Sequence, residues 1–141
     1  MSREISAGII LFRKEKEKIK FLLLKKPSGI FEFPKGLIEK NEDPKITALR
    51  EAKEEAGIKK IKLLEGFKET VKYVYTFKGK KIFKIVIFYL GKTTQKKAKV
   101  SFEHIGYGWY EFKEAKNLLK FKNYQALLEK AKDFIKKTKQ L

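Results

Sequence analysis

The sequence contains no cysteine, comparatively few acidic residues and no long apolar segment. A chain without cysteine has no disulfide, no thiolate metal ligand and no thiol nucleophile. The N-terminal apolar run from Ala7 to Phe12 is too short for the core of a signal peptide or for a membrane span. We therefore expect a cytoplasmic protein without a membrane anchor.

Basic residues outnumber acidic ones by 35 to 17, which gives a formal net charge of +18. Such an excess suits a polyanionic partner such as a nucleotide, a polyphosphate or a nucleic acid. It equally suits simple solubility, or the lysine-rich composition of many hyperthermophile proteins. The 141 residues, with 43% hydrophobic content and twelve phenylalanines, predict a single folded domain over residues 1–141.

The apolar pattern predicts several strands and few helices. Asp43 as N-cap, Pro44 at the first helical position and Gly57 as the stop signal predict a helix that ends at Ala56. The continuous apolar run over 81–90 predicts a central strand buried on both faces. Further strands are expected over 5–12, 19–24 and 108–112, one or two strands over 61–77, and an amphipathic helix from residue 113 onward. The sequence thus predicts an α/β (α+β) fold with a mixed sheet packed between helices.

Three glutamates of the predicted helix carry the chemistry. Glu51, Glu54 and Glu55 have spacings of three and four, which place their carboxylates on one helix face. Clustered carboxylates repel each other unless a cation lies among them, and a hard divalent ion such as Mg2+ prefers oxygen ligands. The adjacent Arg50 can orient a carboxylate through charge-assisted hydrogen bonds, and Gly36 can bring its backbone carbonyl close to a metal.

A simpler interpretation is a solvated acidic face that pairs with Lys53 or Lys59. The wider spacing argues against it. From Gly36 through Glu42 to the segment 50–58, the residues follow G-x5-E-x7-R-E-U-x-E-E-x-G-U, with U apolar and a small Ala52 at the first U. This pattern resembles the signature of the Nudix hydrolases. The resemblance implies an α/β/α sandwich with a mixed sheet, a Mg2+ (or Mn2+) cofactor, pairing of Glu42 with the arginine, and metal ligands at Gly36, Glu51, Glu54 and Glu55.

Segments outside this motif narrow the resemblance. Residues 31–36 (F-E-F-P-K-G) look like the W-x-F-P-K-G segment of asymmetrical diadenosine tetraphosphate hydrolases, and residues 101–109 resemble their H-E-H-x-x-Y-x-W segment. The similarity covers residues 5–135 and departs at Phe31 and Phe102. It implies Mg2+-dependent hydrolysis of diadenosine tetraphosphate (Ap4A) to ATP and AMP. It also makes Glu103 a fourth carboxylate that binds metal or positions water, so Glu51, Glu55 and Glu103 are alternative general bases.

The same resemblance points to side chains that contact the substrate. Lys35 and Lys84 match basic positions used on the polyphosphate, and Lys84 interrupts an apolar strand as expected for a residue that faces a cleft. Candidates for an aromatic clamp on adenine are Tyr73, Phe88 and Tyr124, for which core packing is an equal alternative. His104, the only histidine, either contacts a phosphate, orients Glu103 or packs in the core, and Trp109 is assigned to the core.

Two other functions compete with Ap4A hydrolysis. An enzyme that removes pyrophosphate from the 5′ end of triphosphorylated RNA would have a similar leading segment, and the positive charge would suit RNA. A non-catalytic nucleotide- or RNA-binding module on the same scaffold is the second alternative. Such modules usually lose motif glutamates, whereas this chain has all of them. The sequence leaves the oligomeric state open.

Overall fold

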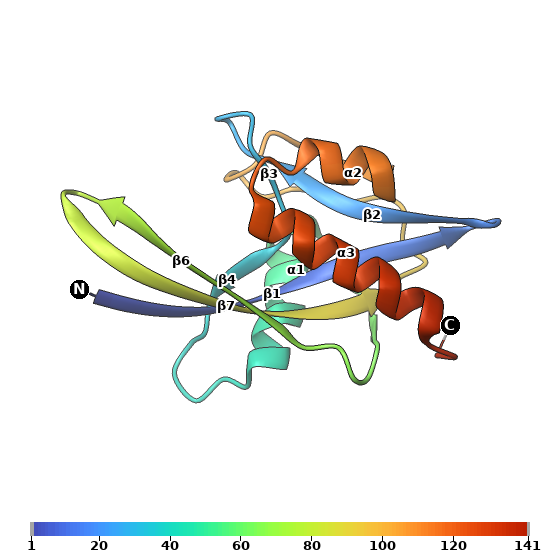
Figure 1. The fold of residues 1–141 in the computed structure, drawn as a ribbon, viewed down its shortest axis with the longest axis horizontal. Helices are drawn as coiled ribbons and strands as arrows, with labels where there is room; N and C mark the ends of the chain where they lie inside the picture. Colours follow the sequence, from blue (N-terminus) through green and yellow to red (C-terminus); the bar gives the residue numbers. More distant parts are fainter. Residues whose placement is uncertain (1, 141) are drawn as a thin grey trace.

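The computed structural model describes residues 2–140, and within them three helices pack on one mixed sheet (Figure 1). The helices are α1 (Pro44–Ala56), α2 (Phe112–Leu118) and α3 (Lys122–Lys137). The strands are β1 (Ser2–Glu15), β2 (Lys18–Lys25), β3 (Phe31–Glu32), β4 (Lys35–Leu37), β5 (Lys62–Leu63), β6 (Glu69–Phe77), β7 (Lys80–Lys92) and β8 (Gly106–Glu111).

The sheet has the order β3-β2-β1-β7-β5, and the three remaining strands attach to it by antiparallel pairing. Strands β1 and β7 run parallel through the centre, in a register from Ser2 opposite Ile82 to Phe12 opposite Lys92. Strand β4 pairs with β1, β6 with β7 and β8 with β2. The short strand β4 thereby lies beside the middle of β1, next to helix α1.

Two apolar cores lie on opposite faces of the sheet, because alternate residues of each strand point to opposite sides. On one face, Ile10 and Phe12 of β1 pack with Leu127 and Leu128 of α3. On the other face, Ile9 and Leu11 of the same strand share a core with small alanines of α1, namely Ala48, Ala52 and Ala56. The arrangement is the predicted sandwich of helix, mixed sheet and helix.

Helix α1 has the predicted bounds, and the apolar region 61–77 forms two strands, β5 and β6, separated by a loop. The C-terminal part differs from the expectation. Phe112, expected at the end of a strand, begins α2. The single C-terminal helix that we expected is interrupted after α2, where Leu119 is buried in the core and its carbonyl accepts a hydrogen bond from the Gln125 side chain at 2.7 Å.

Strand β7 is central, as predicted, but only its second half is buried on both faces. Buried and half-buried residues alternate from Ile82 to Ile87, whereas Phe88 to Gly91 are all buried. The first half runs with β6 and the start of β1 in a ribbon that extends past the helices (Figure 1). None of the helices among residues 2–140 is long and apolar enough to cross a membrane.

Candidate active site

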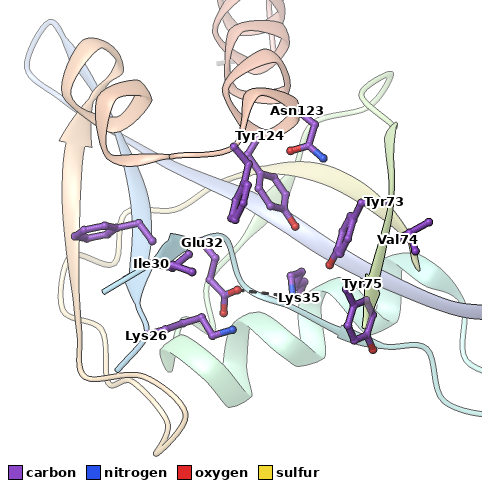
Figure 2. Close-up of a pocket in the computed structure, with 11 residues that line it drawn as sticks. Lys26, Ile30, Glu32, Lys35, Tyr73, Val74, Tyr75, Asn123 and Tyr124 are labelled. Carbon is purple, nitrogen blue, oxygen red and sulfur yellow. Dashed lines mark ion pairs between the residues drawn. The ribbon is translucent and has the colours of Figure 1, made fainter. Parts of the chain in front are cut away.

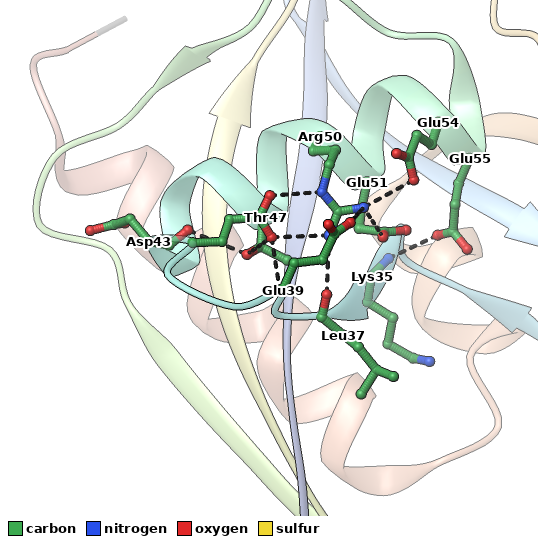
Figure 3. A network of polar contacts seen from close by, with 10 residues as sticks. Lys35, Leu37, Glu39, Asp43, Thr47, Arg50, Glu51, Glu54 and Glu55 are labelled. Atoms are coloured by element: carbon green, nitrogen blue, oxygen red, sulfur yellow. Dashed lines mark hydrogen bonds and ion pairs between the residues drawn. The ribbon is translucent and has the colours of Figure 1, made fainter.

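Helix α1 presents the motif glutamates because both of its ends are fixed. The Asp43 side chain accepts the N–H of Lys45 at 2.8 Å, and Gly57 adopts a left-handed conformation with φ of 66° that ends the helix. The buried alanines face the sheet and allow a close approach of the helix backbone. The opposite edge of α1 then directs its charged side chains toward β4 and the loop that follows it (Figure 3).

Arg50 lies at the centre of the acidic cluster. Its guanidinium donates two hydrogen bonds to Glu42, at 2.8 and 3.0 Å, which is the expected pairing. It also donates to Glu51 at 2.8 Å, to Glu54 at 3.0 Å and to the Leu37 carbonyl at 3.1 Å (Figure 3). The planar, fork-shaped guanidinium suits this role, because its N–H groups can reach several carboxylates at once.

Glu42 accepts further hydrogen bonds within this network. Besides Arg50, it accepts hydrogen bonds from the Thr47 hydroxyl at 2.7 Å and from the Glu39 N–H at 3.1 Å. These donors, with Arg50 as the strongest, lower the pKa of Glu42 to about 2. Glu42 therefore serves to orient Arg50, which in turn holds Glu51 and Glu54.

Gly36 lies directly against the carboxylate of Glu51. A Cβ at this position would come within 2.6 Å of Oε1 of Glu51, and closer still to its carboxyl carbon. Only glycine leaves room for the carboxylate beside the backbone of β4. The side chain of Glu51 is 12% exposed, and burial raises its pKa despite the neighbouring Arg50.

Glu55 belongs to a second, more buried cluster. Its carboxylate accepts the backbone N–H of Lys35 at 2.9 Å. Ligand atoms of Glu55, Glu32 and His104 all lie within 4.8 Å of one another, an arrangement that could also hold a metal ion. Burial raises the pKa of Glu55 to about 7.

Sequence reasoning missed Glu32. It lies 72 residues from His104, and its carboxylate is 2.8 Å from Nε2 of that histidine. A lone carboxylate among the apolar residues Phe31, Phe33 and Pro34 was the available signal, because a charged group in a buried segment needs a partner.

His104 occupies the interior of the site. Its side chain is only 1% exposed, and its Nε2 lies 2.8 Å from a carboxylate oxygen of Glu32. Burial alone would lower the pKa of His104, but the hydrogen bond to Glu32 and the charge of Glu55 raise it. The observed hydrogen-bond partner of His104 is thus Glu32, a residue that the sequence analysis did not single out.

Glu103 lies on an exposed tight turn that faces α1. The turn is closed by the N–H of His104, which donates to the carbonyl of Ser101 at 3.1 Å. The N–H of Ser101 donates to the carbonyl of Glu55 at 3.0 Å, which ties the turn to the end of α1. The charge of Glu103 contributes to the raised pKa of Glu51, so the fourth carboxylate acts on the same cluster.

A cavity of about 430 Å3 opens beside these carboxylates (Figure 2). Tyr73 of β6 and Tyr124 of α3 both point into it, as two of the three predicted aromatic contacts. The remaining lining residues are Lys26, Ile30, Phe31, Glu32, Lys35, Val74, Tyr75, Phe121 and Asn123. Glu32 and Lys35 border both the cavity and the carboxylate cluster, so the two regions are continuous.

Phe88, the third predicted aromatic contact, is fully buried. Its ring packs edge-on against Tyr124, with 5.8 Å between the ring centroids, and against Phe33 at 5.9 Å. The structure therefore places Phe88 in the core that supports Tyr124, and not on the surface of the cavity. Trp109 packs against the core under α1, as predicted, while its indole N–H donates to the carbonyl of Lys96 at 2.7 Å.

Lys84 is buried and paired within the protein. Its Nζ lies 3.2 Å from Oε1 of Glu4, which also accepts the hydroxyl of Tyr75 at 2.6 Å. Burial lowers the pKa of Lys84, and the charge of Lys35 acts in the same direction, which indicates that the two lysines share one region. Glu4, which pairs with Lys84, and Tyr75, which donates to Glu4, were not predicted.

The fold and the site together define a class of protein. The family model described as NUDIX domain matches residues 2–131, so the chain belongs to the Nudix family. It is 35% identical to "Bis(5'-nucleosyl)-tetraphosphatase [asymmetrical]" of Sus scrofa over 142 aligned residues, with 92% of this chain and 94% of that protein covered. An RNA pyrophosphohydrolase of Nitratiruptor is 37% identical over 89 residues, with 62% of this chain and 56% of that protein covered.

A solved structure agrees with this placement. The binary complex of the C. elegans Ap4A hydrolase superposes with a TM-score of 0.84 at 33% sequence identity. The match covers 96% of this chain and 99% of that one. Fold and site therefore belong to a Nudix hydrolase.

Proposed function

We propose that this enzyme is a Mg2+-dependent hydrolase that cleaves Ap4A asymmetrically into ATP and AMP. The observation that carries the proposal is the continuity between the acidic face of α1 and the aromatic cavity, with Lys35 and Glu32 at their boundary. A substrate with a base and several phosphates needs both regions side by side. The names of the pig and nematode relatives support the same substrate. A nucleotide substrate also fits the cytoplasmic location that we propose.

The residues present fit a magnesium site. The donors are carboxylate oxygens of Glu51, Glu54, Glu55 and Glu103, joined by the backbone carbonyl of Gly36, and hard cations of the Mg2+ or Mn2+ type prefer such oxygen ligands. The lack of a side chain at Gly36 keeps the space beside Glu51 open. When bound, Mg2+ would neutralise phosphate charge and lower the pKa of a water molecule.

The side chains around the carboxylates perform the positioning. Arg50 holds Glu51 and Glu54, and the Lys35 N–H holds Glu55. Among the alternative general bases Glu51, Glu55 and Glu103, Glu55 has a pKa of about 7, near the range in which proton transfer is efficient. Fixed geometry of this kind supplies much of the rate enhancement in phosphate hydrolysis.

The cavity would hold one adenosine. Tyr73 and Tyr124 offer π faces on which adenine can stack. The ammonium groups of Lys35 and Lys84 would balance the negative phosphate charge that the bound metal does not neutralise. Lys84 would exchange part of its contact with Glu4 for a phosphate oxygen when the substrate binds.

The test is direct. The pure protein is incubated with Mg2+ and Ap4A, and the products are resolved by anion-exchange chromatography. ATP and AMP in equal amounts are expected, and a mock purification from cells that lack the protein serves as the control for contaminating hydrolases. Two molecules of ADP would mean symmetric cleavage and would refute the proposal.

Removal of pyrophosphate from 5′-triphosphate RNA is the second candidate function. The net charge of +18 and the Nitratiruptor relative favour it. It predicts activity on triphosphorylated RNA that falls steeply as salt concentration rises, because phosphate contacts release counterions. Activity on such RNA, without turnover of Ap4A, would make this the function of the enzyme.

A further inference from the structure

Phe102 is the most exposed of the large apolar side chains among residues 2–140, with 94% of its surface accessible. Burial of an aromatic ring is favourable, and phenylalanine is a residue type that is usually buried. Phe102 immediately precedes Glu103, the carboxylate that faces the acidic cluster. An aromatic ring therefore stands next to the reacting region with no apolar neighbour to cover it.

The turn that carries Phe102 is fixed on both sides. Before it, the N–H of Ser101 donates to the carbonyl of Glu55 at 3.0 Å. After it, the His104 ring is bonded to Glu32 at 2.8 Å, and the N–H of Ile105 donates to the Lys25 carbonyl at 2.8 Å.

The N–H of His104 closes the turn on Ser101, so Phe102 and Glu103 are its two central residues. The turn is thus held at both ends with the Phe102 ring exposed.

The position of the turn follows from a chain of contacts. The aromatic cavity ends at Glu32 and Lys35, and the N–H of Lys35 is bonded to Glu55. Ligand atoms of Glu55 and His104 lie within 4.8 Å of each other. The exposed residues Phe102 and Glu103 directly precede the buried His104 in the chain. The turn therefore adjoins the carboxylate cluster through His104, and none of residues 101–105 lines the cavity.

We propose that Phe102 is the stacking platform for the second nucleobase of the substrate, the one that lies outside the aromatic cavity. The inference rests on the proposed function, because Ap4A carries two adenosines and the cavity offers one aromatic slot between Tyr73 and Tyr124. A polyphosphate bound at the carboxylates would lead the other adenosine toward the turn. Ile105, 60% exposed, and Tyr107, 39% exposed, follow Phe102 along the chain.

The proposal predicts a selective loss of affinity. Dissociation constants are measured by calorimetry on the Mg2+-loaded enzyme, with non-hydrolysable methylene-bridged analogues of Ap4A and of adenosine tetraphosphate, which has the same phosphates but one base. Phe102→Ala is expected to weaken binding of the two-base analogue about tenfold, because stacking of one base on an aromatic ring has about that effect. Binding of the one-base analogue is expected to stay within about twofold of the wild type.

Two further variants complete the experiment. Phe102→Trp keeps an aromatic face and should retain the affinity for the two-base analogue. Phe77→Ala removes another exposed phenylalanine, 56% accessible and at the far end of β6, and should change neither constant.

Three outcomes would overturn the proposal. Equal weakening of both analogues by Phe102→Ala would mean that the residue only supports the turn, and unchanged binding of both would mean that the second base does not reach it. If the wild-type enzyme does not turn over Ap4A, the proposed function itself fails and this inference fails with it. Turnover by the wild type with no selective loss in the variant refutes the inference alone.

Discussion

Replacement of Gly36 by alanine tests how tightly the active-site carboxylates must be held. The new methyl group would lie 2.6 Å from Oε1 of Glu51, whereas ordinary contact begins at 3.4 Å. The carboxylate therefore has to move by about 1 Å, away from the 2.8 Å hydrogen bond that Arg50 donates to it. Displacement of a catalytic group by about 1 Å can lower the rate about 100-fold.

The same substitution should not unfold the protein. The group that the methyl meets is the end of a side chain, so we expect the unfolding free energy to fall by about 1–3 kcal/mol, which leaves the protein folded. The assay is kcat for Ap4A at saturating Mg2+, together with urea unfolding. Gly106→Ala is the matched control, because a Cβ there meets nothing within 4 Å. A folded Gly36→Ala enzyme with a kcat within a few-fold of the wild type would refute the reasoning.

Three further predictions concern individual side chains. Glu55→Gln should lower kcat by about 100-fold or more, and product assays with unchanged turnover would remove Glu55 from metal binding and proton transfer. Lys84→Ala should raise KM for Ap4A about tenfold, and an unchanged KM would leave Lys84 as a partner of Glu4 alone. Folding raises the pKa of His104 above its ordinary value of 6.5, so the protonated histidine stabilises the folded protein below that pH. His104→Gln should therefore lower the unfolding free energy most below pH 6.5. The difference in unfolding free energy from the wild type should shrink as the pH rises through the raised pKa. Urea unfolding from about pH 5.5 to about pH 9 measures it, and a pH-independent difference would exclude a charged pair with Glu32.

Local signals predicted helix α1 and its chemistry. Asp43, Pro44 and Gly57 fix the ends of the helix through contacts between near neighbours, so a short stretch of sequence contains the whole signal. The same holds for Arg50 and the motif glutamates, whose spacing determines their common face. Physical chemistry of the helix then leaves few alternative arrangements.

Long-range contacts could not be predicted in this way. The pairs of Glu32 with His104 and of Glu4 with Lys84 join residues 72 and 80 positions apart, and no local pattern encodes them. Phe88 shows a related limit. Alternation places Lys84 and Phe88 on one face of β7. It does not reveal that Tyr124 covers Phe88, or that Lys84 pairs with Glu4, the partner of the cavity residue Tyr75.

The position of Arg50 has a consequence for how the enzyme responds to its supply of divalent metal ions. Because an internal cation already joins Glu42, Glu51 and Glu54, the acidic face is assembled by the polypeptide itself. Folding then does not have to wait for an ion, in contrast to small domains whose metal provides the folding free energy. Such an enzyme can gain and lose its divalent ion while it stays folded, so its turnover can follow the supply of that ion without resynthesis or refolding.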